Sequence, residues 1–281
     1  MSIVVNNNVA SLIAQRNLSK NTSELSKSIE RLSSGYRINR ASDDSAGLSI
    51  SEGLRGQIRG NNQAQGNIQD GISLLQIAES GLSVINESVQ RIRELCVQAA
   101  NETNGSAERG AVLVEINARL EDINRISKST KFNNVSLLDG SALNARLQVG
   151  ANSTLSTNTI EISSVLSNSN VSTIGLTIAV TGGTWSSDMI RSYLNQIDAA
   201  ISTIVTKRSS IGAYQNRLET SLENLTIMNE NVQTSESRIR DLDIAKETAN
   251  MTKLQILQQA SASVLTQANQ IPQLALTLLR G

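Results

Sequence analysis

The sequence predicts a mainly α-helical protein, built as a long antiparallel, coiled-coil-like helix bundle with a small β-hairpin insert and paired N- and C-terminal helices. Three observations favour this class: long heptad seams of aliphatic residues, an aromatic content of only 2%, and one short Ser-, Thr- and Asn-rich stretch in the middle. Apolar residues at alternating spacings of three and four share one face of a helix. A chain with few rings fills thin layers, as in a bundle, more readily than a thick core.

Residues 1–44 are expected to form the N-terminal helix and the turn that follows it. Its seam runs through Leu18, Leu25, Ile29 and Leu32, and Gly35 then interrupts the pattern before a polar, turn-like stretch. The apolar stripe is narrow. Ordering a backbone costs about 1–2 kcal/mol per residue, so a single such helix pair is expected to form weakly without further copies of the chain.

Residues 45–130 are expected to hold two helices. The first carries the longest unbroken seam, whose spacings alternate between four and three from Ala64 to Ala99. Asn104-Gly105 is a turn signal that ends it. The second helix carries Leu113, Ile116, Leu120 and Ile123.

Residues 131–185 are expected to be a small β or irregular insert. Asn133-Asn134 and Asp139-Gly140 are turn signals, and short pieces after them alternate apolar with polar residues. The pair Gly182-Gly183 closes the insert.

Residues 186–240 are expected to be one long helix and residues 241–281 a last one. Ile197, Ile204, Ile211, Leu218, Leu225, Val232 and Ile239 recur at a strict period of seven. At 1.5 Å per residue this column spans about 64 Å, and its period favours a left-handed twist. The last helix carries Leu257, Val264, Ile271 and Leu278, and Pro272 is expected to kink it or to end its regular bonding.

Composition excludes several functions. The 25 basic and 25 acidic residues balance, which disfavours nucleic-acid binding, and the absence of His removes His-based zinc and Ser–His or Cys–His sites. The single Cys96 lies on a seam and is expected to be buried filler. Asp43-Asp44 are expected to shape a turn or cap a helix, because no third ligand accompanies them. We expect no catalytic residue, cofactor or metal.

The N-terminus has no continuous apolar run, and no stretch approaches the ~20 apolar residues of a membrane helix. We therefore expect no cleaved leader and no membrane partner. The protein would be soluble, or would leave the cell by a route without a removable leader.

Six longer sequence motifs occur along the chain. They are RLSSGYRINRASDDSAGLSIS (31–51), QDGISLLQIAESGLSVINE (69–87), QRIRELCVQAAN (90–101), RSSIGAYQNRLE (208–219), ESRIRDLDIAKE (236–247) and LQQASASVLTQANQIPQLALTLLR (257–280). With these runs in this order, the chain resembles bacterial flagellin. The insert is short, so the resemblance is to a short form without large outer variable domains.

The resemblance implies a secreted structural subunit, not an enzyme, that polymerises into the extracellular flagellar filament for swimming motility. Residues 1–44 and 241–281 would form the inner tube through Leu18, Leu25, Ile29, Leu32, Leu257, Val264, Ile271 and Leu278. Residues 45–130 and 186–240 would form the outer shell around a core of Leu75, Leu82, Ile85, Val89, Ile92, Ile204, Ile211, Leu218 and Leu225.

The resemblance also implies partners. Besides other copies of the chain, they are the flagellar type III export apparatus, a flagellin chaperone at the C-terminal helix, and the hook-associated junction and cap proteins. Arg91, Leu95 and Glu115 match the patch by which host Toll-like receptor 5 recognises flagellins. The same patch is expected to contact a neighbouring subunit.

Three alternatives stay open from the residues. A hook–filament junction protein would share the terminal helices without forming long polymers alone. A coiled-coil signalling adaptor would explain the heptads but not the specific run at 31–51. An enzyme fits least, because nothing supplies a nucleophile with its base.

Overall fold

The computed structural model describes residues 7–141, 145–176 and 185–280, with side chains described up to Gln270. The chain divides into two compact units. One contains the residues up to Gly56 together with those from Asn231 onward, and the other contains Gln57–Glu230. Both units are mainly helical, and the predicted fold class of a helix bundle with small hairpins and paired terminal helices is confirmed.

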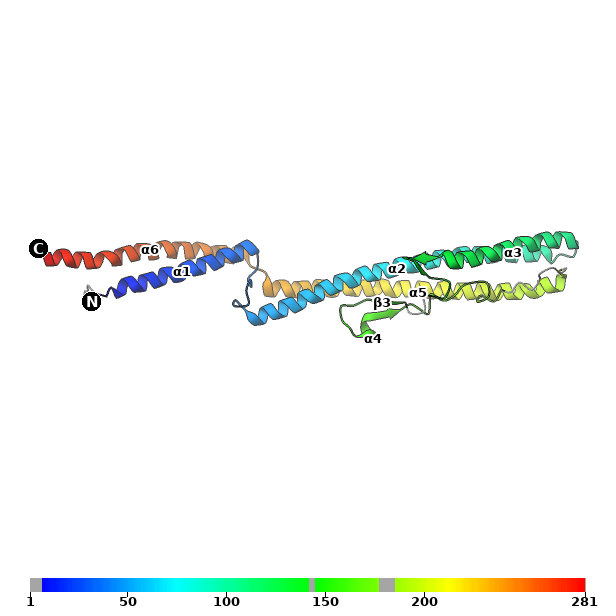
Figure 1. Ribbon diagram of the computed structural model, residues 1–281, viewed down its shortest axis with the longest axis horizontal. Coiled ribbons are helices and arrows are strands. Elements are labelled where there is room, and N and C mark those ends of the chain that lie inside the picture. Colours follow the sequence, from blue (N-terminus) through cyan, green and yellow to red (C-terminus); the bar gives the residue numbers. More distant parts are fainter. Residues whose placement is uncertain (1–6, 142–144, 177–184, 281) are drawn as a thin grey trace. The chain divides into compact units, whose positions relative to one another are not determined.

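In the first unit, helix α1 (Val9–Ser34) lies side by side with helix α6 (Ile244–Arg280), as Figure 1 shows. Asn8 caps the start of α1 by accepting a hydrogen bond from the backbone N–H of Ser11 at 3.1 Å. Gly35 ends α1 in the left-handed conformation, with φ at 75°, and its N–H donates to the carbonyl of Arg31. A residue with a Cβ would be strained there, which explains the break predicted at this glycine.

The connection after α1 is held by residues of the same unit. Tyr36 pairs with Asp241 as an isolated antiparallel bridge. The guanidinium of Arg240 lies 4.8 Å from the centre of the Tyr36 ring and 2.6 Å from a carboxylate oxygen of Glu52. The hydrogen bond from Arg240 lowers the pKa of Glu52 below its ordinary value. A cation between a ring and a carboxylate fixes this connection more firmly than a free loop.

The second unit contains parts of helix α2 (Ser45–Ala99) and helix α5 (Ser187–Arg240), together with helix α3 (Ser106–Ser129). Polar contacts between α2 and α5 show that the two helices run antiparallel, since numbers fall along α5 as they rise along α2. These contacts join Asn62 to Asn229 at 2.7 Å, Glu79 to Arg208 at 3.4 Å, and Arg93 to Asp198 at 2.7 Å.

The insert forms two small antiparallel hairpins. Strand β1 (Lys131–Phe132) pairs with β2 (Val135–Ser136). Asn133 and Asn134 form the turn between them, and their positive φ angles of 44° and 68° are ones that asparagine tolerates. Strand β3 (Arg146–Gln148) pairs with β4 (Thr159–Glu161), and the short helix α4 (Leu155–Asn158) lies between them. The predicted turn at Gly182-Gly183 lies outside the described residues.

One glycine lets the insert approach the helices. A Cβ at Gly71 of α2 would lie 2.2 Å from a methyl carbon of Leu147 on β3. Any larger residue at this position would push the strand away from the helix. The glycine on the α2 seam therefore serves the hairpin as well as the helix packing.

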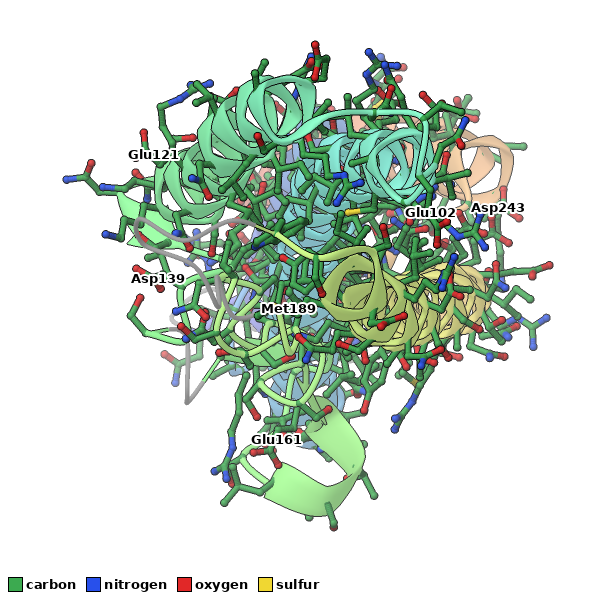
Figure 2. All side chains as sticks on the ribbon, turned by 90° about the vertical axis from the view of Figure 1, so that its right-hand side faces the viewer. Glu102, Glu121, Asp139, Glu161, Met189 and Asp243 are labelled. Atoms are coloured by element: carbon green, nitrogen blue, oxygen red, sulfur yellow. The ribbon has the colours of Figure 1, made fainter. Side chains whose placement is uncertain are left out.

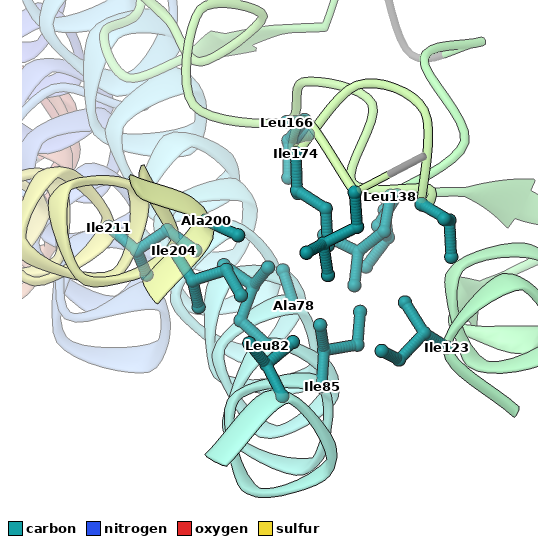
Figure 3. Packing of buried hydrophobic residues seen from close by; sticks show 14 of the residues in the cluster. Ala78, Leu82, Ile85, Ile123, Leu138, Leu166, Ile174, Ala200, Ile204 and Ile211 are labelled. Carbon is teal, nitrogen blue, oxygen red and sulfur yellow. The ribbon is translucent and has the colours of Figure 1, made fainter. Parts of the chain in front are cut away.

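The core of the second unit is continuous along α2, α3 and α5 and is covered by the insert. Figure 3 shows Ala78, Leu82 and Ile85 of α2 among side chains of α5, α3 and the insert. All nine residues predicted for this core are buried: Leu75, Leu82, Ile85, Val89, Ile92, Ile204, Ile211, Leu218 and Leu225. The thin aliphatic layer is what a chain with few rings can fill.

Cys96 lies in this core and is 0% exposed. Burial raises the pKa of its thiol to about 12. Thiol reagents react with the thiolate. At neutral pH the Cys96 thiol should not react in the native protein, because it is protonated and because reagents cannot reach it.

We predict that a bulky thiol reagent labels native protein at pH 8 only as fast as the second unit unfolds. The matched control is Cys96→Ser combined with Val97→Cys, because Val97 is the next residue on α2 and is 52% exposed. The control should react roughly 100-fold faster, as expected for an accessible thiol of ordinary pKa. Equal labelling of the two proteins in the folded state would contradict the burial of Cys96.

Candidate assembly surfaces

The seam between α1 and α6 is made mostly of small and polar side chains. On α1 its buried residues are Ala14, Leu25 and Ser28, and on α6 its best-buried residues are Glu247 and Ala268. Four of these five side chains carry little or no apolar area. The pair therefore buries much less apolar surface than the core of the second unit.

Hydrogen bonds between side chains, or from a side chain to a carbonyl, run along this seam. Five of them join the helices in antiparallel order: Asn8 Nδ2 to the Ala268 carbonyl at 2.8 Å, Ser11 Oγ to Asn269 Oδ1 at 2.7 Å, Asn21 Nδ2 to Ser261 Oγ at 2.9 Å, Gln258 Nε2 to Thr22 Oγ1 at 3.1 Å, and Ser28 Oγ to Glu247 Oε1 at 2.5 Å. Polar pairs thus alternate along the seam with buried or half-buried leucines, which are Leu18, Leu25, Leu32, Leu254 and Leu265.

Large aliphatic side chains lie on the other faces of both helices. They are Val9, Leu12, Ile13 and Ile29 on α1, and Ile244, Ile256, Leu257 and Val264 on α6. Leu12 and Ile256 are 62% and 61% exposed. Single exposed aliphatic residues are normal on a surface, and eight of them lie on this one helix pair.

The residues predicted for the inner tube fall into three groups. Leu25 is buried in the α1–α6 seam, and Leu18 and Leu32 are half-buried. Ile29, Leu257 and Val264 are exposed on the single chain. The side chains of Ile271 and Leu278 lie outside the described residues.

The observed seam differs from the predicted one by a single position on each helix. On α1 the residue that faces α6 after Leu25 is Ser28, not Ile29, because its hydroxyl bonds to Glu247. On α6 the half-buried seam residues are Gln258 and Leu265, each one place beyond the predicted Leu257 and Val264. A search for aliphatic columns misses a seam whose members are polar.

The exposed Leu12, Ile13, Ile244 and Ile256 were not part of the sequence prediction. A signal for them does exist in the adjacent pairs Leu12-Ile13 and Ile256-Leu257. Neighbouring residues on a helix point about 100° apart, so both members of such a pair cannot face one partner helix. Two adjacent aliphatic residues on a narrow helix indicate a second contact face.

The predicted receptor patch lies on α2 and α3 of the second unit. Arg91 contacts Glu94 at 2.8 Å and Glu115 at 3.5 Å. The hydrogen bond that Arg91 donates to Glu94, followed by the charge of Glu115, raises the pKa of Arg91. Arg91 and Glu115 are exposed, whereas Leu95 is only 2% exposed and belongs to the core. Leu95 can therefore support this patch from below but cannot itself touch a partner in this structure.

The acidic residues do not gather into a metal site. No group of three His, Cys, Asp or Glu side chains suited to a metal ion occurs among the described residues. The carboxylate of Asp43 accepts from the backbone N–H of Arg40 at 3.1 Å, which lowers its pKa, and Asp44 accepts from that of Gly47 at 2.9 Å. Both side chains shape their own loop. Figure 2 shows Glu121 and Glu161 pointing away from the ribbon.

A unit with a closed aliphatic core, and a second unit that leaves aliphatic faces open on paired terminal helices, define the subunit of a self-assembling structural polymer. The model of the bacterial flagellin N-terminal helical region matches residues 5–143, and the model of the bacterial flagellin C-terminal helical region matches residues 194–279. The chain belongs to the bacterial flagellin family. It is accordingly a structural protein that polymerises into the flagellar filament, and not an enzyme.

Full-length relatives agree with this assignment. A flagellin of Halalkalibacterium halodurans is 45% identical over 278 residues, which are 99% of this chain and 100% of the relative. A flagellin of Bacillus subtilis is 41% identical over 302 aligned positions, covering 98% of this chain and 99% of the relative. The lengths match from end to end, as expected for a short form without large variable domains.

A solved structure described as a flagellar hook-associated protein of Vibrio parahaemolyticus is 16% identical, covers 71% of this chain and all of its own, and superposes with a TM-score of 0.58. This likeness shows a shared fold alone. The much higher identity to flagellins disfavours the junction-protein alternative, and the family assignment disfavours the signalling adaptor. No helix in the described part of the chain is long and apolar enough to cross a membrane.

Proposed function

We propose that the outward aliphatic faces of α1 and α6 are the contacts that join neighbouring subunits into the inner tube of the filament. One observation carries this proposal: the terminal helices pair through a largely polar seam and leave their large aliphatic side chains exposed. The residues assigned to the tube from the sequence are Leu18, Leu25, Ile29, Leu32, Leu257, Val264, Ile271 and Leu278. Of these, Ile29, Leu257 and Val264 lie on the outward faces, whereas Leu18, Leu25 and Leu32 line the seam and would hold the helix pair itself together. The exposed Val9, Leu12, Ile13, Ile244 and Ile256 are added to the outward set.

Energetics favour assembly at these faces. Burying an exposed Leu, Ile or Val side chain contributes about 1.5–3 kcal/mol. Such contributions add to the helix hydrogen bonds and the seam contacts, which together oppose the cost of ordering the backbone, about 1–2 kcal/mol per residue. We infer that the pair gains most of its order when subunits meet, and that contacts between copies are heterologous and do not close into a ring.

We predict that Leu257→Gln/Val264→Gln slows seeded filament elongation at least tenfold. Glutamine keeps helix propensity, so the change removes only apolar contact. The matched control, Lys253→Gln/Ser263→Gln, alters two exposed polar positions on the same helix and should elongate normally. Elongation is followed by light scattering after adding sonicated wild-type seeds. Equal rates for the two variants would remove Leu257 and Val264 from the interface.

We propose in addition that the subunit is secreted through the flagellar type III export apparatus and functions in the extracellular filament. Support comes from the basic residues Lys27, Arg31, Arg37 and Arg40, which cluster at the end of α1 and in the following loop. The exposed faces of α6 are suited to a flagellin chaperone that covers them before assembly, since unassembled aliphatic surface favours aggregation. Hook-associated junction and cap proteins would meet the same faces at the two filament ends.

A second candidate function is recognition of the free subunit by host Toll-like receptor 5. Its support is the accessible pair Arg91 and Glu115, held together on α2 and α3 by their ion pair at 3.5 Å. The exposed Val114 beside Glu115 adds an apolar contact to the charged ones. In the filament the patch would face a neighbouring subunit, so that only free subunits would signal.

We predict that Arg91→Ala/Glu115→Ala lowers receptor activation by the free subunit at least tenfold in a reporter cell assay. Asp122→Ala/Arg125→Ala is the matched control, because it removes an exposed ion pair of 2.8 Å from α3 without touching the patch. Exposed pairs contribute little to stability, so both variants should stay folded. Undiminished activation by the first variant would rule out this receptor contact.

A further inference from the structure

The best-buried polar contact between α1 and α6 joins Ser28 to Glu247. Ser28 is 1% exposed and Glu247 is 9% exposed. The hydroxyl of Ser28 donates a hydrogen bond to Glu247 Oε1 at 2.5 Å. The same carboxylate oxygen also accepts from Asn250 Nδ2 at 3.2 Å on its own helix. A carboxylate with little solvent depends on such protein donors.

The carboxylate is fixed relative to the start of α6. Glu247 stands in the first turn of α6, where the helix dipole favours a negative side chain. Asp243 caps this turn by accepting from the backbone N–H of Lys246 at 3.0 Å. The hydrogen-bonding position that Glu247 offers to α1 is therefore set by where α6 begins.

The other members of the seam select register only weakly. Leu18, Leu25 and Leu32 on α1 recur at intervals of seven, so after a slip of one heptad Leu254 on α6 could still face a leucine of α1. The polar pairs Ser11–Asn269 and Thr22–Gln258 are solvent-exposed, and water can replace those bonds.

A slip would, in contrast, break the buried pair. One heptad corresponds to about 10 Å along the axis. A slip toward the C-terminal end of α6 would set Ser28 opposite Leu254 and would carry Glu247 past the last turn of α1. The carboxylate would then lose its donor from α1. A slip of one heptad in the other direction would set Asn21 opposite Glu247, and Asn21 would then have to give up its hydrogen bond to Ser261. A buried polar side chain fixes register in other coiled coils.

We propose that the buried Ser28–Glu247 pair sets the register of α1 against α6 and thereby fixes the relative axial positions of the outward aliphatic side chains of the two helices. Glu247 and Ser28 are positioning residues for assembly, since they select one of several pairings of similar apolar content. The inference concerns helix pairing within one chain, and it stands whether or not the exposed aliphatic faces form the tube.

The test reads register directly by disulfide crosslinking in filaments grown from wild-type seeds, in a Cys96→Ser background. Ser11→Cys with Asn269→Cys reports the observed register, because these side chains lie 2.7 Å apart. Leu18→Cys with Asn269→Cys reports a slip of one heptad toward the C-terminal end of α6, because residue 18 lies seven places after Ser11. Disulfides form only when the Cα atoms come within about 7 Å. With Ser28 and Glu247 intact, the first pair should crosslink at least tenfold more than the second.

The decisive variant is Ser28→Ala/Glu247→Leu, which removes both polar partners. Replacing both partners by apolar groups leaves the helices able to pair, so seeds should still elongate, with the two crosslinks now within about twofold of each other. Glu247→Gln keeps an acceptor of the same size, and Ser26→Ala removes an exposed hydroxyl bonded within α1. Both should retain the original preference.

Two results would overturn the proposal. In one, the double variant keeps the tenfold preference for the observed register, so other contacts would fix it. In the other, the double variant fails to elongate while Glu247→Gln elongates normally, which would make the pair a source of stability and not of register. Neither result bears on whether Leu257 and Val264 join neighbouring subunits, which the elongation assay of that pair decides separately.

Discussion

Two paired helices cannot bury the aliphatic side chains that their own sequences carry. A helix pair has one seam, and in this chain much of that seam is taken by polar and small residues such as Asn21, Ser28 and Glu247. Leu12, Ile13 and Ile256 are consequently left on outer faces in the single chain. Since exposed aliphatic area is unfavourable in water, the unit reaches a satisfied state only when further helices cover it. We relate the structural role of the protein to these aliphatic side chains, which the helix pair alone leaves exposed.

The second unit buries a layer of aliphatic side chains within one chain. Three helix segments and the insert surround one aliphatic layer, and residues such as Leu82, Ile85 and Ile204 are completely buried. We therefore expect this unit to fold before assembly. One chain thus combines a closed core, which gives a stable building block, with open faces, which give the block something to bind.

The sequence predicts the closed unit better than the open one. An uninterrupted heptad of aliphatic residues has one physical interpretation, so the helices of the second unit and the buried residues that they carry follow from spacing. Their antiparallel pairing follows from the simplest way to fold the chain back, and the buried residues of the insert were not predicted. The seam of α1 and α6 is harder, because a polar residue such as Ser28 or Glu247 is normally assigned to solvent. Only its partner on a distant helix explains its burial, and sequence spacing does not reveal that partner. The position of Leu95 shows the converse limit, since a motif match names a residue without saying which way it points.

The central claim is that contacts made by the C-terminal helix are indispensable for polymer growth but not for the closed unit. Deleting residues 257–281 and adding wild-type seeds tests it, with filament length read by electron microscopy and the second unit checked by its thermal unfolding. Our account predicts seeds that do not lengthen, together with an unfolding transition for the second unit like that of the full chain. Filaments as long as those of the full chain would contradict it.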